Sequence, residues 1–436
     1  MSSIVNTATT ILPSAFILLS VFVFAIGTLF MFQKQITSHA IILIALINVI
    51  AAITSQYFPE DTLHTGIIRA VVMFGSFAYY LPKLKIDSTT KVIIVYLSYL
   101  LIIVTFSSNV ESTFSTYLKH GIGLLMFPIA YQYFKDLNNI KALAYLVVIS
   151  LALINANLIV AQFFHIGRVV YGGSIYVGGG RMGQTYLIAY FLLSIPLILL
   201  FKLRERLKLL LFIVYPLSIM FLFLVGRRGS ILGFLAGLFV YSLFTYRKSK
   251  AMTALSTMVL VGIIAFSVYA EQINFVQDRI MSISEPEDIA RYQEVFWSME
   301  LIQEKGITHA LFGSELFNYQ AITGGRRGLH MDYTTLLIGS GVLGLLLYLS
   351  IYYTLFKQII RIAAKIKSNK MRREIYATFF SLITCAAIIS ISGQYGSISS
   401  LALLFIIFGS ILGITFALAE QDYSGIFVNK SAPLHK

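Results

Sequence analysis

The segment SSLALLFIIFGSILGITFAL, residues 399–418, contains no charged side chain. About 20 apolar residues in an α-helix are long enough to cross the roughly 30 Å hydrocarbon layer of a membrane. Runs of the same kind recur along the 436-residue chain, which is 58% hydrophobic and only 12% charged. Backbone groups in lipid must be paired within the protein, which leaves helices or closed barrels, and we find no short segments of alternating polarity typical of a barrel. The sequence therefore predicts an all-α, polytopic integral membrane protein.

Thirteen runs are candidate spans, so we expect about 12–13 transmembrane helices. They lie at residues 12–32, 39–56, 65–81, 92–106, 120–134, 142–163, 185–201, 208–225, 230–246, 252–270, 334–356, 375–392 and 399–418. The first run is too long for a secretory signal and has no basic residue before it. We therefore interpret it as a retained span.

The distribution of basic residues predicts the orientation. Lys and Arg collect in the cytoplasmic loops of membrane proteins, and the loop 357–373 contains seven of them. Taking this loop as cytoplasmic places 22 of the 33 basic residues in cytoplasmic loops and the C-terminal tail. The N-terminus is then non-cytoplasmic and the C-terminus cytoplasmic. The same bias accounts for the net charge of +14 without a nucleic-acid partner.

The chain divides into three parts. Residues 1–270 contain the first ten spans with short loops, 271–333 form a long non-cytoplasmic loop, and 334–436 contain the last spans and the tail. Within the long loop, ARYQEVFWSMELIQEK at 290–305 has the periodicity of an amphipathic helix, which we expect to lie on the membrane surface. Close helix contact is indicated by three glycines, Gly339, Gly341 and Gly344.

Neither a metal nor another cofactor is expected. The single cysteine, Cys385, lies inside an apolar run, and no Cys/His spacing typical of a metal site occurs. The expected outer loops contain no Asp-x-Asp pair. No Asp, Glu or Lys falls in the middle of an expected span, whereas ion-coupled transporters usually place such a group there.

Arginines instead form four clusters in the expected outer loops. The planar guanidinium can grip two phosphate oxygens at once, and neighbouring glycines let backbone N–H groups approach an anion. The clusters therefore suggest a bound phosphate or pyrophosphate headgroup. The alternative is salt bridges with the ten acidic residues of the long loop, or attraction to anionic lipid. The residues are Arg181 in GGGRMGQT, Arg227 and Arg228 in GRRGS, Arg291 in RYQEVFW, and Arg326 and Arg327 in GRRGLHMDY, which also contains His330 and Asp332.

At these motifs the chain resembles the O-antigen polymerase and O-antigen ligase superfamily of bacterial envelope glycosyltransferases, over roughly 165–360. GRMGQTYLIAYFLLSIPLILL resembles the family's arginine before a mid-chain helix, and GRRGSILGFLAGLF resembles its Arg-Gly/Ser helix start. RYQEVFWSMELIQEKGITHALFGSELFNYQ is similar to its Arg, Trp and Gly-x-Gly segment, and HMDYTTLLIGSGVLGLLLYL to its His-Asn-x-Tyr-Leu block. The sequence departs from the family at Met331, Asp332 and the segment 313–315.

The resemblance implies a metal-independent, GT-C-like glycosyltransferase in the bacterial cytoplasmic (inner) membrane. Its substrate would be an undecaprenyl-pyrophosphate-linked oligosaccharide, used on the outer face, and its partners would include membrane lipid, a flippase and a chain-length regulator. A repeat-unit polymerase is favoured, and a ligase transferring polysaccharide to a lipid A core is the alternative. The clustered arginines would stabilise the pyrophosphate leaving group. His330 would deprotonate the acceptor hydroxyl, with Asp332 as the alternative base.

Two other classes of function stay open. A flippase for the same lipid-linked sugars needs polar groups along a central cavity, and the spans offer few beyond Tyr and Ser. A scaffold or assembly protein needs none of the arginine clusters.

Overall fold

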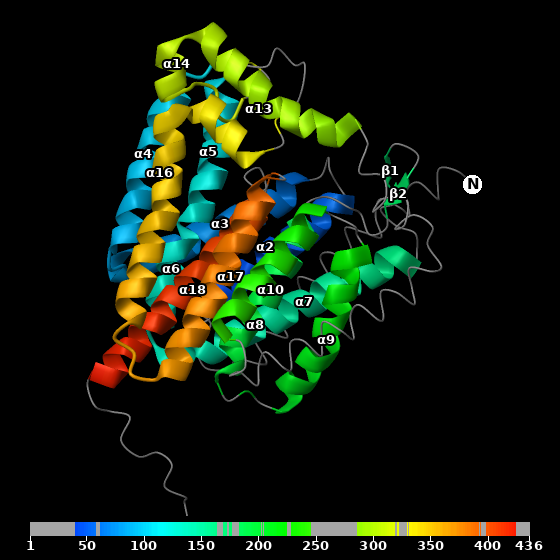
Figure 1. Ribbon diagram of the computed structural model, residues 1–436, viewed down its shortest axis with the longest axis vertical. Helices are drawn as coiled ribbons and strands as arrows, with labels where there is room; N and C mark the ends of the chain where they lie inside the picture. The colour runs from blue at the N-terminus through cyan, green and yellow to red at the C-terminus, as the bar shows by residue number, and fades with distance from the viewer. Residues whose placement is uncertain are drawn as a thin grey trace, which may run out of the picture.

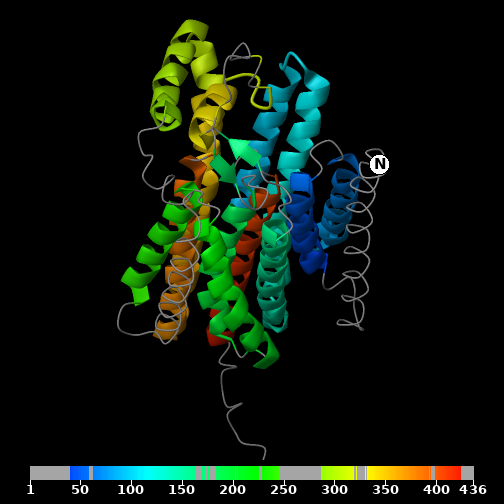
Figure 2. The ribbon, with the colours of Figure 1, turned by 90° about the vertical axis from the view of Figure 1, so that its right-hand side faces the viewer.

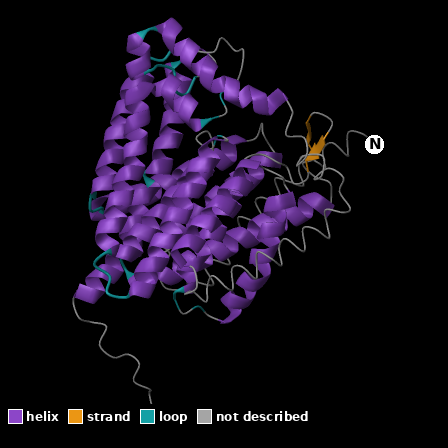
Figure 3. Cartoon of the chain, in the orientation of Figure 1, coloured by secondary structure: helices purple, strands orange, loops and turns teal. Residues whose placement is uncertain are grey.

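The protein is a bundle of helices with one small β-hairpin (Figures 1 and 3). The computed structural model describes residues 40–57, 62–163, 169–171, 174–176, 183–201, 203, 205–224, 228–245, 286–318, 321, 329, 331–391, 393 and 398–423. The expected spans 12–32 and 252–270 lie outside these residues.

The described helices follow one another along the chain. They are α2 (Ala40–Tyr57), α3 (Thr62–Tyr80), α4 (Ser88–Thr105), α5 (Val110–Leu124), α6 (Met126–Phe134), α7 (Ile140–Phe163), α8 (Gly183–Leu199), α9 (Glu205–Leu224), α10 (Arg228–Thr245), α13 (Pro286–Lys305), α14 (Ile307–Phe312), α16 (Asp332–Ala363), α17 (Asn369–Ile391) and α18 (Ile398–Tyr423), with short 3-10 turns at Leu81–Lys83 and Leu137–Asn139. In the glycine-rich segment after α7, β1 (Val169–Tyr171) pairs antiparallel with β2 (Ser174–Tyr176).

Among the described residues, six helices are long and apolar enough to cross a membrane: Ser88–Thr105, Leu137–Val160, Glu205–Phe223, Asp332–Ala363, Asn369–Ile391 and Ile398–Gln421. The expectation of a helical, multi-pass membrane protein is confirmed. The other eleven expected spans fall on helices, with two departures. The first is 120–134, which is divided between α5 and α6. Pro128 has no N–H to donate to the carbonyl four residues earlier, so the helical hydrogen-bond ladder is interrupted at this point.

Helix α18 is the core of the bundle. In its apolar stretch 94% of the residues are buried, against 44–61% in the other five candidate spans. A helix that is hydrophobic on all sides belongs in the centre of a bundle, and α18 lies among the other helices in both views (Figures 1 and 2). The segment whose sequence most clearly predicted a membrane helix is therefore the one most enclosed by protein.

Glycines bring two helix pairs into backbone contact. On α10, a Cβ added at Gly233 would lie 3.1 Å from the carbonyl oxygen of Cys385, and one at Gly237 would lie 2.8 Å from that of Ser381. On α18, a Cβ at Gly409 or Gly413 would approach the backbone of α6 within 2.4–2.6 Å. Both pairs have the four-residue spacing of small residues at membrane helix contacts. The contacts advance from Gly233 to Gly237 along α10 and go back from Cys385 to Ser381 along α17, so the two helices are antiparallel.

The second departure is α16, expected as one span at 334–356. Gly341 has φ 66° and ψ −179°, so two helical arms, 332–340 and 342–363, meet there. The hydroxyl of Tyr376 on α17 donates to the carbonyl oxygen of Ile360, and the hydroxyl of Tyr333 donates to that of Ala387 on α17. The two α17 residues are about 17 Å of helix apart, whereas a straight α16 would separate Ile360 from Tyr333 by about 40 Å, so the first arm must fold back toward the second. Only the arm 342–363 is left to cross the membrane.

The glycine contact between α10 and α17 predicts that a side chain added at Gly237 lowers the stability of the protein. In Gly237→Ala the new methyl group would lie 2.6 Å from Leu193 and 2.8 Å from backbone, so the helices must separate, at a cost of about 1–3 kcal/mol. The matched control is Gly75→Ala in α3, where nothing lies within 4 Å of the added Cβ. Thermal unfolding in detergent should give a lower midpoint for Gly237→Ala and an unchanged or higher one for Gly75→Ala. Equal midpoints would refute close packing at this contact.

Candidate functional site

Three helix starts gather at the Ile391 end of α17. The hydroxyl of Tyr186, in the first turn of α8, donates to the carbonyl oxygen of Gly393 at 3.2 Å. The hydroxyl of Tyr333, at the start of α16, donates to that of Ala387 at 3.0 Å. Because α10 is antiparallel to α17, its first residue, Arg228, lies at the same end. Three of the sequence motifs are thereby brought to one side of the bundle.

Helix α13 is fastened to this end by a buried carboxylate. Glu294, which is 5% exposed, accepts hydrogen bonds from the backbone N–H of Met331 at 3.1 Å and from the hydroxyl of Thr334. Both donors belong to the first turn of α16. Arg291 precedes Glu294 by three residues on the same helix. The carboxylate therefore holds the backbone of the Arg291 motif against the segment that contains His330 and Asp332.

Asp332 lies deeper than the sequence suggested. We expected it in an outer loop, in the same motif as Arg326 and Arg327, but its side chain is only 2% exposed. Its charge acts on Tyr190 of α8 and on Tyr348 and Tyr352 of α16. The fold-back at Gly341 explains the difference, because it turns the start of α16 into the bundle. As the first helical residue, Asp332 also faces the positive end of the helix dipole.

The predicted arginines are only partly within the described residues. Arg228 and Arg291 are placed by their helices, and their side chains are not described. The remaining predicted site residues, Arg181, Arg227, Arg326, Arg327 and His330, lie outside the described residues. In the sequence, Arg181 precedes the first residue of α8 by two positions.

One arginine that we had not proposed for the site also reaches this side of the bundle. Arg69 of α3 donates to the hydroxyl of Ser399, in the first turn of α18, at 3.2 Å. A charged group at membrane depth is costly and is usually kept for function. In the sequence, nothing linked Arg69, which falls inside the expected span 65–81, to residue 399.

A second polar cluster holds the residues that directly follow α14, 313–318. Glu315 has φ 62°, in the left-handed region, and its carboxylate accepts from the hydroxyl of Ser107 at 2.6 Å and from the N–H of Ser108. Desolvation raises the pKa of this carboxyl, but hydrogen bonds from Ser107, Ser108 and Asn318 outweigh it and leave the pKa below its ordinary value. Glu315 thus ties this segment to the turn between α4 and α5.

His309 of α14 is 9% exposed, and its Nδ1 lies 3.3 Å from the hydroxyl of Ser314. Burial, together with the charge of Lys305, lowers the pKa of His309. The buried imidazole of His309 is therefore a neutral packing group of the outer segment. Among the described residues, no three His, Cys, Asp or Glu side chains come together as a metal site would require.

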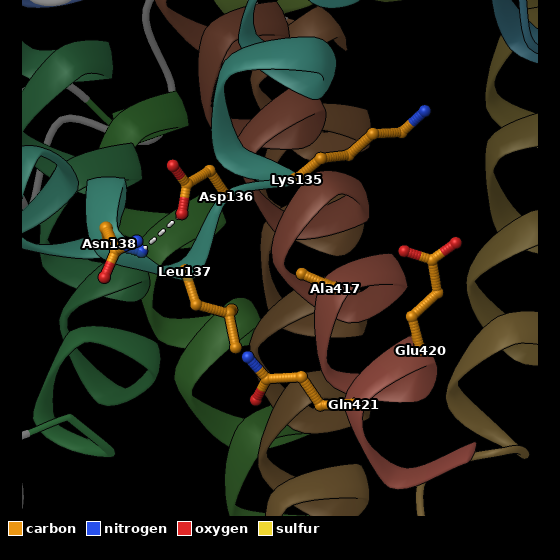
Figure 4. A pocket seen from close by; sticks show the side chains of 7 residues that line it. All are labelled: Lys135, Asp136, Leu137, Asn138, Ala417, Glu420 and Gln421. Atoms are coloured by element: carbon orange, nitrogen blue, oxygen red, sulfur yellow. Dashed lines mark hydrogen bonds between the residues drawn. The ribbon is translucent and has the colours of Figure 1, made fainter. Parts of the chain in front are cut away.

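A surface depression lies at the other end of the bundle, near the end of α18 (Figure 4). The ammonium group of Lys135 there lies 4.1 Å from the centre of the Tyr131 ring and 4.7 Å from that of Phe416. Burial and the nearby charge of Lys85 lower the pKa of Lys135. About 29 Å of α18 separates this end from residue 398, so the depression is no part of the arginine site. Its lining consists of Lys135, Asp136, Leu137, Asn138, Ala417, Glu420 and Gln421.

No protein-family model matches the sequence, and no curated protein matches it. The assignment of function therefore depends on the residues and their placement.

The hydrogen bonds from α16 to Glu294 predict that Glu294→Ala weakens the contact between α13 and the first turn of α16. The variant leaves the N–H of Met331 without its acceptor and leaves the hydroxyl of Thr334 only the carbonyl oxygen of Met331 to donate to, at about 1–3 kcal/mol for an unsatisfied buried group. Hydrogen exchange of the first turn of α16 should accelerate. The control is Glu300→Ala, an exposed carboxylate on the same helix. If both variants exchange like the parent protein, Glu294 does not hold the two helices together.

Proposed function

We propose that this protein is a metal-independent membrane glycosyltransferase that polymerises undecaprenyl-pyrophosphate-linked oligosaccharide repeat units on the outer face of the bacterial cytoplasmic membrane. The proposal combines the family resemblance of the motifs with their gathering at one end of the bundle. The ligase that would transfer polysaccharide to a lipid A core stays the alternative within the same family.

The observation that carries the proposal is the convergence of α8, α10, α13 and the start of α16 at the Ile391 end of α17. Each of these elements contains or directly follows one of the arginine motifs. Arginines from separate helices can grip the two phosphates of a lipid pyrophosphate from several sides, and they stabilise negative charge as it develops on the leaving group. We assign donor binding to Arg181, Arg228 and Arg291, with Arg227, Arg326 and Arg327 in support.

The reaction needs a base as well as an anion site. The hydroxyl oxygen of the acceptor sugar bonds to the anomeric carbon of the donor, the bond from that carbon to the pyrophosphate oxygen breaks, and the hydroxyl proton passes to the base. His330 suits this step because its ordinary pKa is close to neutral pH. Asp332 is buried beside tyrosines, which favours an electrostatic role over contact with a sugar.

A transporter of the same lipid-linked sugar is the second candidate, and one observation favours it. Besides Asp332, the bundle buries Glu374, which is fully enclosed and accepts a hydrogen bond from the hydroxyl of Tyr241 at 2.5 Å. Buried carboxylates within a membrane bundle often serve transport. Purified protein in vesicles separates the two: a polymerase lengthens the sugar chain, and a flippase moves the lipid without lengthening it.

The proposed base predicts the behaviour of His330→Ala. Loss of a positioned base costs about 100-fold to 10,000-fold in rate, so the purified variant should bind donor lipid and make almost no polymer. His330→Gln should fail too, because an amide does not accept the proton. The assay uses native lipid-linked repeat units without any lipid A core, which a ligase would require. Near-normal turnover by His330→Ala would remove His330 from the mechanism.

The proposed anion site predicts that Arg291→Lys fails nearly as badly as Arg291→Ala, because an ammonium group cannot reproduce the two-point grip of a guanidinium. Donor binding should weaken in both. Arg361→Lys, in the last turn of α16 at the other end of the bundle, is the matched control and should behave like the parent protein. Full polymer from Arg291→Lys at normal expression would contradict a bidentate contact.

A further inference from the structure

Helix α14 presents an apolar surface that no described element covers. Ile307 is 77% exposed, Leu311 46% and Phe312 49%. We call these three side chains the α14 face. The helix, ITHALF, contains no Asp, Glu, Lys or Arg, and its one histidine is turned inward. An uncharged, exposed face of this kind is usually covered by another molecule.

The depth of α14 follows from its contact with α4. The hydroxyl of Tyr99 lies 2.8 Å from the carbonyl oxygens of both Phe312 and Ser340. Helix α4 is one of the candidate membrane spans and ends at Thr105. Tyr99 is six residues earlier, about 9 Å of helix rise, and a tyrosine side chain cannot carry its contacts past that end. Phe312 and the turn at Gly341 therefore lie level with the last turns of a membrane span.

The α14 face is also continuous with the surface that the spans turn toward lipid. On α4, Ile102 is 59% exposed, and Phe106, directly after the helix, is 77% exposed. On the crossing arm of α16, Leu346 is 55% exposed. Figure 1 shows α14 just beyond the upper ends of these two helices. Because the Phe312 end of α14 contacts Tyr99 of α4 and the turn at Gly341 of α16, the molecules that cover the apolar side chains of these helices also reach the α14 face.

We propose that α14 is seated in the membrane leaflet at the Thr105 end of α4, with the acyl chains of membrane phospholipids covering Ile307, Leu311 and Phe312. The nearby Lys305, at the end of α13, extends toward the headgroups, as lysines at membrane boundaries do. The carboxylate of Glu315 is directed away from lipid, toward Ser107 and Ser108. This seating is independent of the proposed reaction.

The position of α13 relative to the membrane follows from the seating of α14. Since Glu294 fastens α13 to α16, and α13 leads directly into α14, a lipid-seated α14 fixes the Arg291 motif near the headgroup layer. Part of the segment expected as a loop outside the membrane is then a membrane-seated unit. The alternative to lipid is a second protein that covers the α14 face.

The single tryptophan of the chain, Trp297, makes a direct test possible. In a Trp297→Phe background, Phe312→Trp is reconstituted into phosphatidylcholine vesicles with or without bromine on the acyl chains. Its emission should fall strongly in brominated lipid and resist acrylamide. The matched control, Glu300→Trp on the exposed polar side of α13, should respond to acrylamide and not to bromine.

The opposite pattern for Phe312→Trp, with acrylamide quenching and no effect of bromine, would overturn the proposal and leave the face for a protein partner. If Phe312→Trp does not fold, Ile307→Trp carries the same test from the other end of the helix. Trp297→Tyr serves as the background if Trp297→Phe is unstable. Quenching of Glu300→Trp by bromine would also count against the proposal, because it would place all sides of the segment in lipid.

Discussion

Helices inside a membrane gain little from the hydrophobic effect when they meet, because lipid tails are as apolar as their side chains. Association then depends on close packing, and in this protein glycine provides it. Gly233 and Gly237 let α10 lie against the backbone of α17, and Gly409 and Gly413 let α18 lie against α6. The position of α17 is thereby fixed, and its Ile391 end becomes the support on which the starts of α8 and α16 rest through hydrogen bonds from Tyr186 and Tyr333.

The fold-back at Gly341 uses the same property of glycine for a different purpose. Gly341 and Gly313 both have φ near +65°, and a Cβ on Gly313 would lie 2.3 Å from the backbone nitrogen of Gly341. Two chain segments can cross so closely only where neither has a side chain. Tyr99 closes the crossing from α4. The result is a short arm, 332–340, that returns into the bundle and places Asp332 among tyrosines.

Hydrophobic run length predicted the fold well, because crossing a membrane constrains each helix by itself. The run at 399–418 needed no knowledge of its neighbours to be recognised as a span. The site was predicted less completely, because its geometry depends on pairs of distant residues. Nothing in the sequence links Glu294 to Thr334, or Arg69 to Ser399. The glycine at 341 was noted as a contact residue, but its positive φ, and with it the burial of Asp332, depends on the approach of Gly313.

The placement of the acidic residues bears on the purpose of the outer arginines. The long loop 271–333 has ten acids, and the sequence left open whether they neutralise the arginines. Three of them are turned into the protein: Glu294 and Glu315 accept hydrogen bonds from α16 and from the turn after α4, and Asp332 lies among tyrosines. These carboxylates act as hydrogen-bond acceptors and charges inside the fold. The composition of the loop therefore overstates the number of acids at the surface, where an anionic headgroup arriving from the membrane plane would meet the field of the protein.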